Sequence, residues 1–265
     1  MVRLALASIV VVALSVNATP LALHPAWPGT EHKKSFIDFG RRIAEGTECE
    51  CDLSQVSLPI GTSISESEPQ PRLTTTAPIP LPPHSQALTL SHIALGRGTQ
   101  NYTCDTTNST SAPTAIGAVA SLFNITCLAA FAPALINILP QIALDLPVPD
   151  VPSQPSQSFF DLSGHHYFLN ATTPFFNLDT SAHDYGMGAF RKANATAAPA
   201  GAMKGVGGKG DGAVAWLKLC ALGGEGESLK EVYRVQTAGG NPPASCAGMP
   251  SAFEVQYAAQ YWFFS

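Results

Sequence analysis

Charged residues are scarce in this sequence. Lys, Arg, Asp and Glu make up 12% of its 265 residues, against about 25% in an average soluble protein. The formal net charge is −5, and the few basic residues form no strong cluster. Proteins that bind nucleic acid or anionic membrane surfaces usually carry a concentrated positive patch. We therefore expect neither kind of partner.

Long apolar runs are also lacking after the first residues. A membrane-spanning helix needs about 20 consecutive apolar residues. The best candidate, residues 128–144, is interrupted by Pro133 and Pro140. The sequence therefore predicts no membrane span in the body of the chain.

The first residues have the pattern of a secretory signal peptide. Arg3 precedes the apolar run 4–16, and small residues at Val16 and Ala18 fit a cleavage site. An N-terminal membrane anchor is the alternative, but thirteen apolar residues are short for a span. We predict a signal peptide over residues 1–18 and a secreted, extracellular or cell-wall protein.

Common catalytic motifs such as H-E-x-x-H and G-x-S-x-G are missing, and one nucleotide-like pattern occurs. Residues 205–210 (GVGGKG) match G-x-G-x-x-G. A dinucleotide site needs those glycines between a buried strand and a helix, whereas here a loop of small residues precedes them and a strand follows. A phosphate-binding P-loop would need Ser or Thr after Lys209. We predict a surface loop here and no cofactor.

Six cysteines, an even number, agree with an oxidising route. They are Cys49, Cys51, Cys104, Cys127, Cys220 and Cys246. Six cysteines allow 15 pairings. We favour Cys104–Cys127 and Cys220–Cys246, because each pair joins neighbouring elements. Cys49 and Cys51 would then bind each other or a more distant partner.

N-glycosylation sequons provide a second sign of secretion. Five lie after the predicted signal peptide, at Asn101, Asn108, Asn124, Asn170 and Asn194. Behind a signal peptide, such sequons predict an N-glycoprotein. Their glycans would hydrate a surface that has few charges.

The C-terminal fifty residues indicate the fold. Residues 216–222, 232–237 and 253–264 are rich in aromatic and β-branched residues and are separated by Gly, Pro and Asn. In the last segment the odd-numbered residues share an apolar face. Trp262 and Phe264 lie on the other face, where we expect a ligand or a second layer. The fold class is mainly β, an antiparallel sandwich or barrel with a few helical additions.

The rest of the chain divides into two parts. Residues 19–72 contain an amphipathic helix at 31–44 and a connector rich in Ser, Thr and Pro, and residues 73–265 form the β-rich domain. Within this domain we predict strands at 88–95 and 100–104 with a turn or bulge between them.

Further elements follow in the same domain. We predict a helix over 112–128, because Ile116, Val119, Leu122 and Phe123 are at helical spacing. Short helix or coil follows to residue 146, and then strands at 159–169 and 174–177.

Side chains suited to acid–base or metal chemistry are densest between residues 161 and 184. They are Asp161, His165, His166, Asp179, His183 and Asp184. Histidine transfers protons or binds metal near neutral pH, and aspartate can orient it. Because neighbours in a strand face opposite sides, at most one of His165 and His166 joins a given site. A catalytic site would combine it with Asp179 and His183, while a structural or surface role is the default.

Several runs of sequence resemble a known family. They are residues 96–104 (GRGTQNYTC), 164–167 (GHHY), 216–219 (WLKL), 233–243 (YRVQTAGGNPP) and 257–264 (YAAQYWFF). They resemble a family of secreted fungal and bacterial proteins that is catalogued only as a domain of unknown function. The resemblance covers about residues 73–265 and implies secretion, but no catalytic residues. Fungal members often carry an automatic malate dehydrogenase name, which the sequence does not favour because its glycines lack a strand–turn–helix context and the predicted compartment is wrong for that enzyme.

Two main hypotheses for function follow. The leading one is an extracellular or cell-wall-associated module that binds a glycan or small ligand through loops and aromatic side chains. These aromatics are Trp216, Tyr233, Tyr257, Tyr261, Trp262, Phe263 and Phe264. The alternative is a secreted hydrolase or metal-using enzyme built on the His/Asp group, and a third possibility is a purely structural surface or host-interaction protein.

Overall fold

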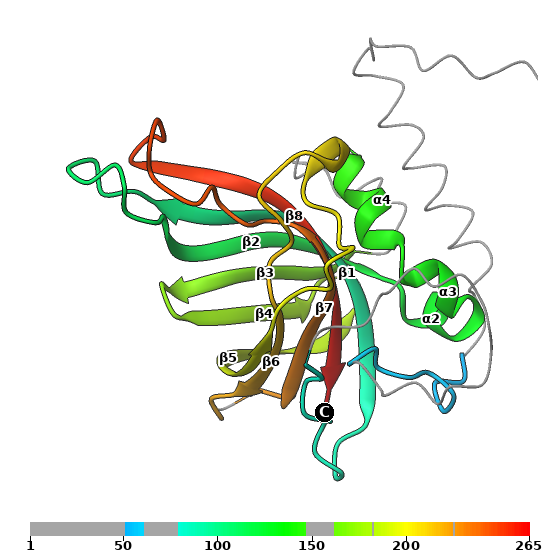
Figure 1. Ribbon diagram of the computed structural model, residues 1–265. Helices are drawn as coiled ribbons and strands as arrows, with labels where there is room; N and C mark the ends of the chain where they lie inside the picture. Colours follow the sequence, from blue (N-terminus) through cyan, green and yellow to red (C-terminus); the bar gives the residue numbers. More distant parts are fainter. Residues whose placement is uncertain (1–50, 61–78, 147–161, 182, 225) are drawn as a thin grey trace, which may run out of the picture.

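The protein is a closed barrel of eight antiparallel strands, each hydrogen-bonded to the next along the chain (Figure 1). The computed structural model describes residues 51–60, 79–146, 162–181, 183–224 and 226–265. The strands are β1 (Leu90–Thr103), β2 (Thr114–Asn124), β3 (Leu162–Asn170), β4 (Thr173–Asp179), β5 (Asp184–Thr196), β6 (Trp216–Ala221), β7 (Glu231–Gly239) and β8 (Ala252–Phe264). The mainly β fold class is confirmed, and of the two predicted architectures it is the barrel.

The pairing of β1 with β8 closes the barrel. It runs from Leu90 opposite Phe264 to Thr103 opposite Ala252, nearly the full length of both strands. Both are long and lie next to each other only because the sheet curls fully round. Closure removes the exposed edges that an open sheet would present.

Alternation along β8 separates two cores. Tyr257, Ala259, Tyr261 and Phe263 point into the barrel, where they pack with residues such as Phe176. The intervening side chains point outward and are equally buried. The strand therefore needs a covering layer, because side chains on successive residues face opposite sides of a sheet.

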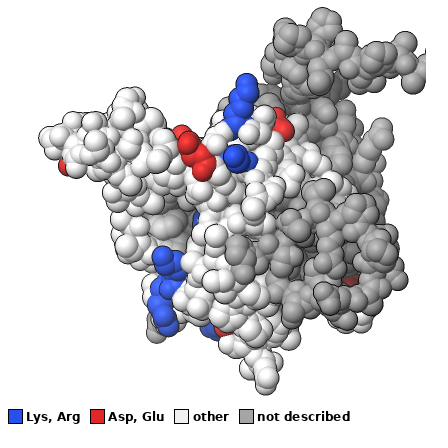
Figure 2. Space-filling model, viewed as in Figure 1, with Lys and Arg blue, Asp and Glu red and all other residues white. Residues whose placement is uncertain are grey.

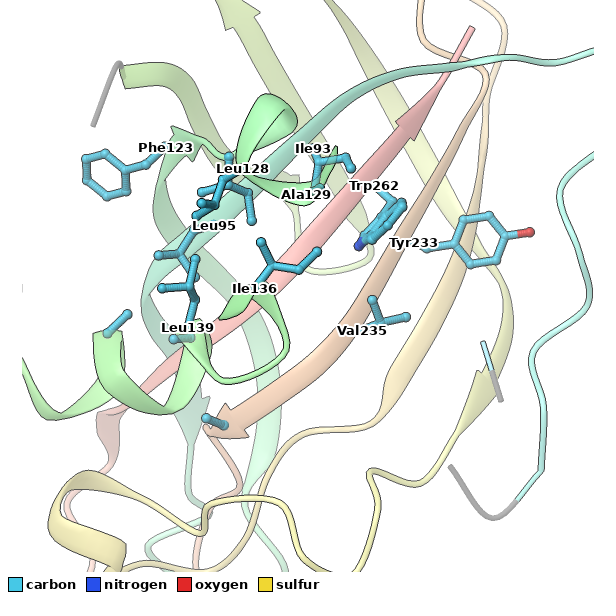
Figure 3. Close-up of a cluster of buried hydrophobic side chains, with 14 of the residues drawn as sticks. Ile93, Leu95, Phe123, Leu128, Ala129, Ile136, Leu139, Tyr233, Val235 and Trp262 are labelled. Atoms are coloured by element: carbon cyan, nitrogen blue, oxygen red, sulfur yellow. The ribbon is translucent and has the colours of Figure 1, made fainter. Parts of the chain in front are cut away.

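Three short helices supply that layer. They are α2 (Thr126–Phe131), α3 (Pro133–Ile136) and α4 (Leu139–Asp145), and they lie against one side of the barrel (Figure 1). Figure 3 shows Ile136 and Leu139 facing side chains of the barrel wall, with Trp262 beside them. Trp262 and Phe264 therefore belong to the outer core, as the second-layer alternative predicted.

The helical layer is also held by hydrogen bonds from the barrel. The Arg97 side chain donates to the carbonyl oxygens of Ala143 (2.8 Å), Leu144 and Leu146 (both 3.2 Å) at the end of α4. Gln260 Nε2 donates to Ile136 O at 2.6 Å. Arg97 thus binds carbonyl oxygens at the C-terminal end of α4, where the regular i+4 amide partners of a helix are missing.

Two predictions for the first strands are wrong. Residues 96–98 form no turn, because β1 is continuous from Leu90 to Thr103. Residues 112–128 are mostly strand, β2, and helix begins only at Thr126. The apolar spacing suggested one helix face, yet Ile116 and Val119 are exposed whereas Leu122 lies inside the barrel. Pairing with both β1 and β3 outweighs that local pattern.

The later strands agree with the sequence. β3 and β4 meet at the turn after Asn170, and β6, β7 and β8 occupy the three predicted C-terminal segments. The glycines at 205–210 form a loop with a single 3₁₀ turn, η1 (Val206–Gly208). No strand–turn–helix unit surrounds them, so the described structure gives this motif no nucleotide-binding context.

Both favoured disulfide pairings are wrong. The bonds are Cys104–Cys246 and Cys51–Cys127. Cys104 follows the end of β1, which pairs with the start of β8, so its spatial neighbour is the loop before β8. Cys220 on β6 has no disulfide partner among the described residues, and Cys49 lies outside them.

Several other predictions fall outside the described residues. These are the signal peptide, the helix at 31–44, most of the connector and Asp161. The domain boundary near residue 72 stays a prediction, although Val56, Leu58 and Ile60 pack against the outer core. In the part of the chain that is described, no helix is long and apolar enough to cross a membrane. The described part of the face shown in Figure 2 is mostly uncharged, as the composition implies.

Candidate ligand-binding site in the barrel

The inside of the barrel is apolar toward one end and polar toward the other. The apolar end is filled by side chains such as Leu122, Leu178 and Phe263. The polar end contains five side chains that we call the Arg234 cluster: Gln100, Tyr102, Arg234, Tyr257 and Tyr261. Such a small polar group within an apolar enclosure is typical of small-molecule sites.

Arg234 points into the barrel because of its register. On β7 it lies opposite Leu217 on one side and Tyr261 on the other, and both are part of the inner core. Its Nε and Nη2 atoms donate to Ala215 O at 3.2 and 2.9 Å. Among the described residues, no carboxylate forms an ion pair with this half-buried guanidinium.

The three phenols of the cluster are neutral hydrogen-bonding groups. Burial raises the pKa of Tyr257 well above its ordinary value. It also raises the pKa of Tyr261, although the nearby Arg234 charge acts in the opposite direction. The Tyr257 and Tyr261 hydroxyls lie 2.9 Å apart, and Tyr102 donates to Gly240 O at 2.7 Å.

Gln100 is the member with an unused donor. It lies inside the barrel opposite Ala118, and its side chain is 8% exposed. Its Nε2 atom makes no hydrogen bond of normal geometry among the described residues, although the side chain lies close enough to the Tyr257 hydroxyl to lower the pKa of that phenol. Leaving a buried polar atom unpaired costs about 1–3 kcal/mol, so Gln100 is available for a partner that enters the barrel.

Glycines allow the chain to pack closely around the cluster. Gly240 has φ +97°, and a Cβ there would lie 2.9 Å from Tyr257 Cβ and 3.2 Å from Gln100 Cγ. At Gly96 a Cβ would overlap the Tyr261 ring. A larger residue at either position would displace a member of the Arg234 cluster.

Part of β5 beside the polar end of the barrel is exposed on both faces. The pairing of β5 with β4 ends at Phe175 opposite Ala189, whereas its pairing with β6 continues to Thr196. Residues 191–195 are all exposed. Since successive residues face opposite sides of a strand, both faces of this part of β5 contact solvent, including the one turned to the barrel interior.

The histidine and aspartate residues of the enzyme hypothesis lie in separate places. His166 is inside the barrel, with its ring stacked on Phe176 at 4.2 Å and Nδ1 2.9 Å from Phe175 O. Burial lowers its pKa to about 4. His165 is half-buried and lies opposite Ser121 and Asn177.

Asp179 and His183 lie near the apolar end. His166 is opposite Phe176 on β4, and Asp179 is three residues further on, or about 10 Å along the strand. Asp179 pairs with Asp184 and accepts a hydrogen bond from the Gly186 amide at 2.6 Å. Burial, and then the neighbouring Asp184, raise its pKa. The His183 ring stacks on Tyr185 at 5.0 Å.

The sequence did not reveal a buried histidine–hydroxyl group beside this region. His92 Nε2 is 2.7 Å from Ser163 Oγ, and its Nδ1 is 3.2 Å from Thr126 Oγ1. Ser and His at this distance can form a nucleophile and its base. Here Ser163 is 0% and His92 is 1% exposed. The hydrogen bonds of this buried group therefore connect β1, β3 and α2. The three residues are too far apart in sequence to form a local motif.

Arg234 and Gln100 were also not identified as site residues from the sequence. Both lie in runs that carry the family resemblance, 233–243 and 96–104, but their convergence depends on the barrel register. Within the described ranges, no group of three or more His, Cys, Asp or Glu side chains could hold a metal ion.

Comparison with known proteins identifies the family of the chain. Residues 83–265 match the model described as protein of unknown function (DUF3455), and the chain belongs to that family. This confirms the resemblance to a domain of unknown function. No curated protein and no solved structure matches the chain.

Proposed function

We propose that this member of the DUF3455 family is a secreted glycoprotein that binds a small organic molecule inside its barrel. The observation that carries the proposal is the unused donor of Gln100 within the Arg234 cluster. Barrels of eight strands are just wide enough to hold side chains or one small ligand. The exposed stretch of β5 offers a route to the cluster.

A small ligand fits the aromatic residues better than a glycan on an exposed platform. The seven aromatics that could have formed such a platform, from Trp216 to Phe264, are all buried. Rings that stack on sugars at a surface must be exposed, and these rings instead form the inner and outer cores. We therefore retain the small-ligand alternative of the original hypothesis.

Secretion and glycosylation are supported by the sequence and by the accessibility of the sequons. Asn108, Asn170 and Asn194 are exposed, whereas Asn101 and Asn124 are half-buried. Asn124 also accepts a hydrogen bond from the Thr126 amide at 2.9 Å. We expect glycans first at the three exposed positions. Two disulfides suit an oxidising compartment.

The binding proposal is tested with N-phenyl-1-naphthylamine, an uncharged fluorescent apolar probe, on the full-length protein recovered from a secreting host. Ala118 points into the barrel opposite Gln100, so Ala118→Leu fills the space where the ligand would lie. Ala115 is exposed on the same strand, and Ala115→Leu is the matched control.

We expect saturable binding by the wild type and the control, and at least tenfold weaker binding by Ala118→Leu. Circular dichroism checks folding, and Leu217→Trp provides a second way to fill the barrel. Absence of saturable binding by the wild type would overturn the proposal. So would equal affinity in a folded barrel-filling variant.

A further inference from the structure

We infer that the ligand of the barrel is a small organic carboxylate, with its carboxylate on Arg234 and Gln100 and its apolar part toward the inner aromatic wall. This inference rests on the proposed function and specifies the chemical class of its ligand. It follows from charge, hydrogen-bonding capacity and the shape of the site.

The charge inside the barrel is positive and unbalanced among the described residues. Arg234 affects the pKa values of four groups, Tyr102, Tyr257, Tyr261 and His166. The phenols have raised pKa values and His166 a lowered one, so all four are neutral at neutral pH. An enclosed charge without a counter-ion is costly, and an anionic ligand would supply one.

The hydrogen bonds of Arg234 leave one side of its guanidinium available. Nε and Nη2 donate to Ala215 O, and the Tyr261 hydroxyl lies close enough to the guanidinium for a hydrogen bond. A guanidinium carries five N–H groups in a planar fork that matches a carboxylate bidentately. The pair Nη1 and Nη2 can therefore bind both oxygens of one carboxylate.

Gln100 supplies a second donor from the same side of the barrel. β1 and β7 lie on either side of β8, and Gln100 and Arg234 both face inward from them. Tyr257 of β8 lies between them in the sheet, opposite Gly98 of β1 and Gly239 of β7. An amide N–H is a donor that pairs with a carboxylate oxygen, whereas a cationic ligand would leave Gln100 Nε2 and the guanidinium unsatisfied.

The surroundings of the cluster accommodate an apolar body. Leu217, Phe168 and Val214 pack with the inner core near this end, and the facing positions on β1 and β2 are the small residues Gly98, Ala118 and Ala120. His166 and Phe176 provide a stacked pair of rings beside Tyr261. A flat aromatic body is the shape that such a wall binds best.

The test compares 2-naphthoate with 2-naphthamide, which have the same rings but differ in the charge of the head group. Isothermal titration calorimetry measures both affinities at pH 7. We expect the wild type to bind the carboxylate at least tenfold more tightly than the amide. Arg234→Gln should abolish this preference, and Gln100→Leu should weaken carboxylate binding about three- to tenfold.

Controls separate this inference from the proposed function. Arg191 is exposed on β5, and Arg191→Gln should leave the preference unchanged, which excludes a general effect of net charge. Binding of N-phenyl-1-naphthylamine by Arg234→Gln shows that the barrel remains intact. If the neutral probe binds but the wild type has no preference for the carboxylate, the inference fails and the proposed function stands. If neither probe binds, both fail.

Discussion

At the scale of single residues, Arg97 shows how one side chain can attach a layer to a barrel. It is 2% exposed and lies on the outer face of β1, in the run 96–104. Burial lowers its pKa to about 10, so the guanidinium stays charged at neutral pH. Its donors bind backbone carbonyls from two parts of the chain, the end of α4 and the barrel wall.

We predict that Arg97→Leu lowers the free energy of unfolding by at least about 2–3 kcal/mol, because hydrogen bonds to charged groups contribute about 1.5–3 kcal/mol each and several carbonyls would lose their partner. Arg97→Lys should recover only part of the lost stability, because a single ammonium group cannot reproduce the planar set of donors of a guanidinium. Urea unfolding measures the free energy of unfolding of both variants, and Arg191→Leu, at an exposed position, is the control. Equal stability of Arg97→Leu and the control would contradict this role.

Two buried histidines predict a pH dependence of stability. Burial lowers the pKa values of His92 and His166 to about 4, from an ordinary value near 6.5. Between these values the unfolded chain binds protons that the folded protein does not. Their neutral forms therefore stabilise the fold above pH 6.5, and this stabilisation is lost as pH falls toward 4. Each residue contributes a slope of about 1.4 kcal/mol per pH unit.

His166→Phe keeps the ring stacked on Phe176 and removes one titrating group. We expect the variant to lose about 1.4 kcal/mol per pH unit less than the wild type between pH 6 and pH 5. Loss of the bond to Phe175 O lowers its stability at every pH but does not change the slope. Urea unfolding at a series of pH values measures this, and an unchanged slope would show that His166 is protonated in the folded state.

At the scale of elements, an ion pair fastens the segment before β1 to the outside of the barrel. Lys218 Nζ lies 3.1 Å from Glu231 Oε2 and donates to Pro83 O at 2.7 Å. Ser85 donates to Glu231 through its hydroxyl and its amide. Tyr233 adds a hydrogen bond to Pro82 O at 2.8 Å. These contacts join β6 and β7 to residues 82–85.

We predict that Glu231→Gln destabilises the protein by about 3–5 kcal/mol, the usual cost of removing one partner of a buried ion pair. The double variant Lys218→Met, Glu231→Gln should be more stable than the single one, because no unpaired cation remains. Burial alone would raise the pKa of Glu231, but hydrogen bonds from Ser85 and Lys218 outweigh it and lower the pKa. The contribution is thus complete above about pH 4.5 and is lost as pH falls further.

Thermal unfolding of the single and double variants at pH 7 and pH 4 measures this coupling. A double variant less stable than Glu231→Gln at pH 7 would contradict it. The difference in stability between the wild type and Glu231→Gln should be smaller at pH 4 than at pH 7. A difference that is equal at both pH values, or larger at pH 4, would also contradict the coupling.

At the scale of elements, the strands that were predicted correctly are those with the clearest local sequence pattern. β6, β7 and β8 alternate clearly between Gly- and Pro-rich turns, so the sequence predicted them. β2 presents Ala118 and Ala120 to the inside of the barrel, and alanine favours helix when judged alone. Its strand pairing comes from β1 and β3, which a local pattern does not contain.

At the scale of the whole molecule, contacts between distant parts of the chain were the least predictable. Cys104 and Cys246 are 142 residues apart, and they meet only because β1 pairs with β8. The same closure brings Gln100 from β1 and Arg234 from β7 to the inside of one barrel. Sequence reasoning chose the local His/Asp group instead, because its members are close in sequence. In the structure, His166 lies apart from Asp179.

The central claim is that a small molecule binds inside the barrel at the Arg234 cluster. Nuclear magnetic resonance of the 15N-labelled protein tests it most directly, by following the Gln100 side-chain amide and the Arg234 Nε–H during titration with 2-naphthoate. We predict large, saturable shifts of both signals and none at exposed Arg191. Shifts confined to exposed residues, with Gln100 and Arg234 unmoved, would contradict the claim.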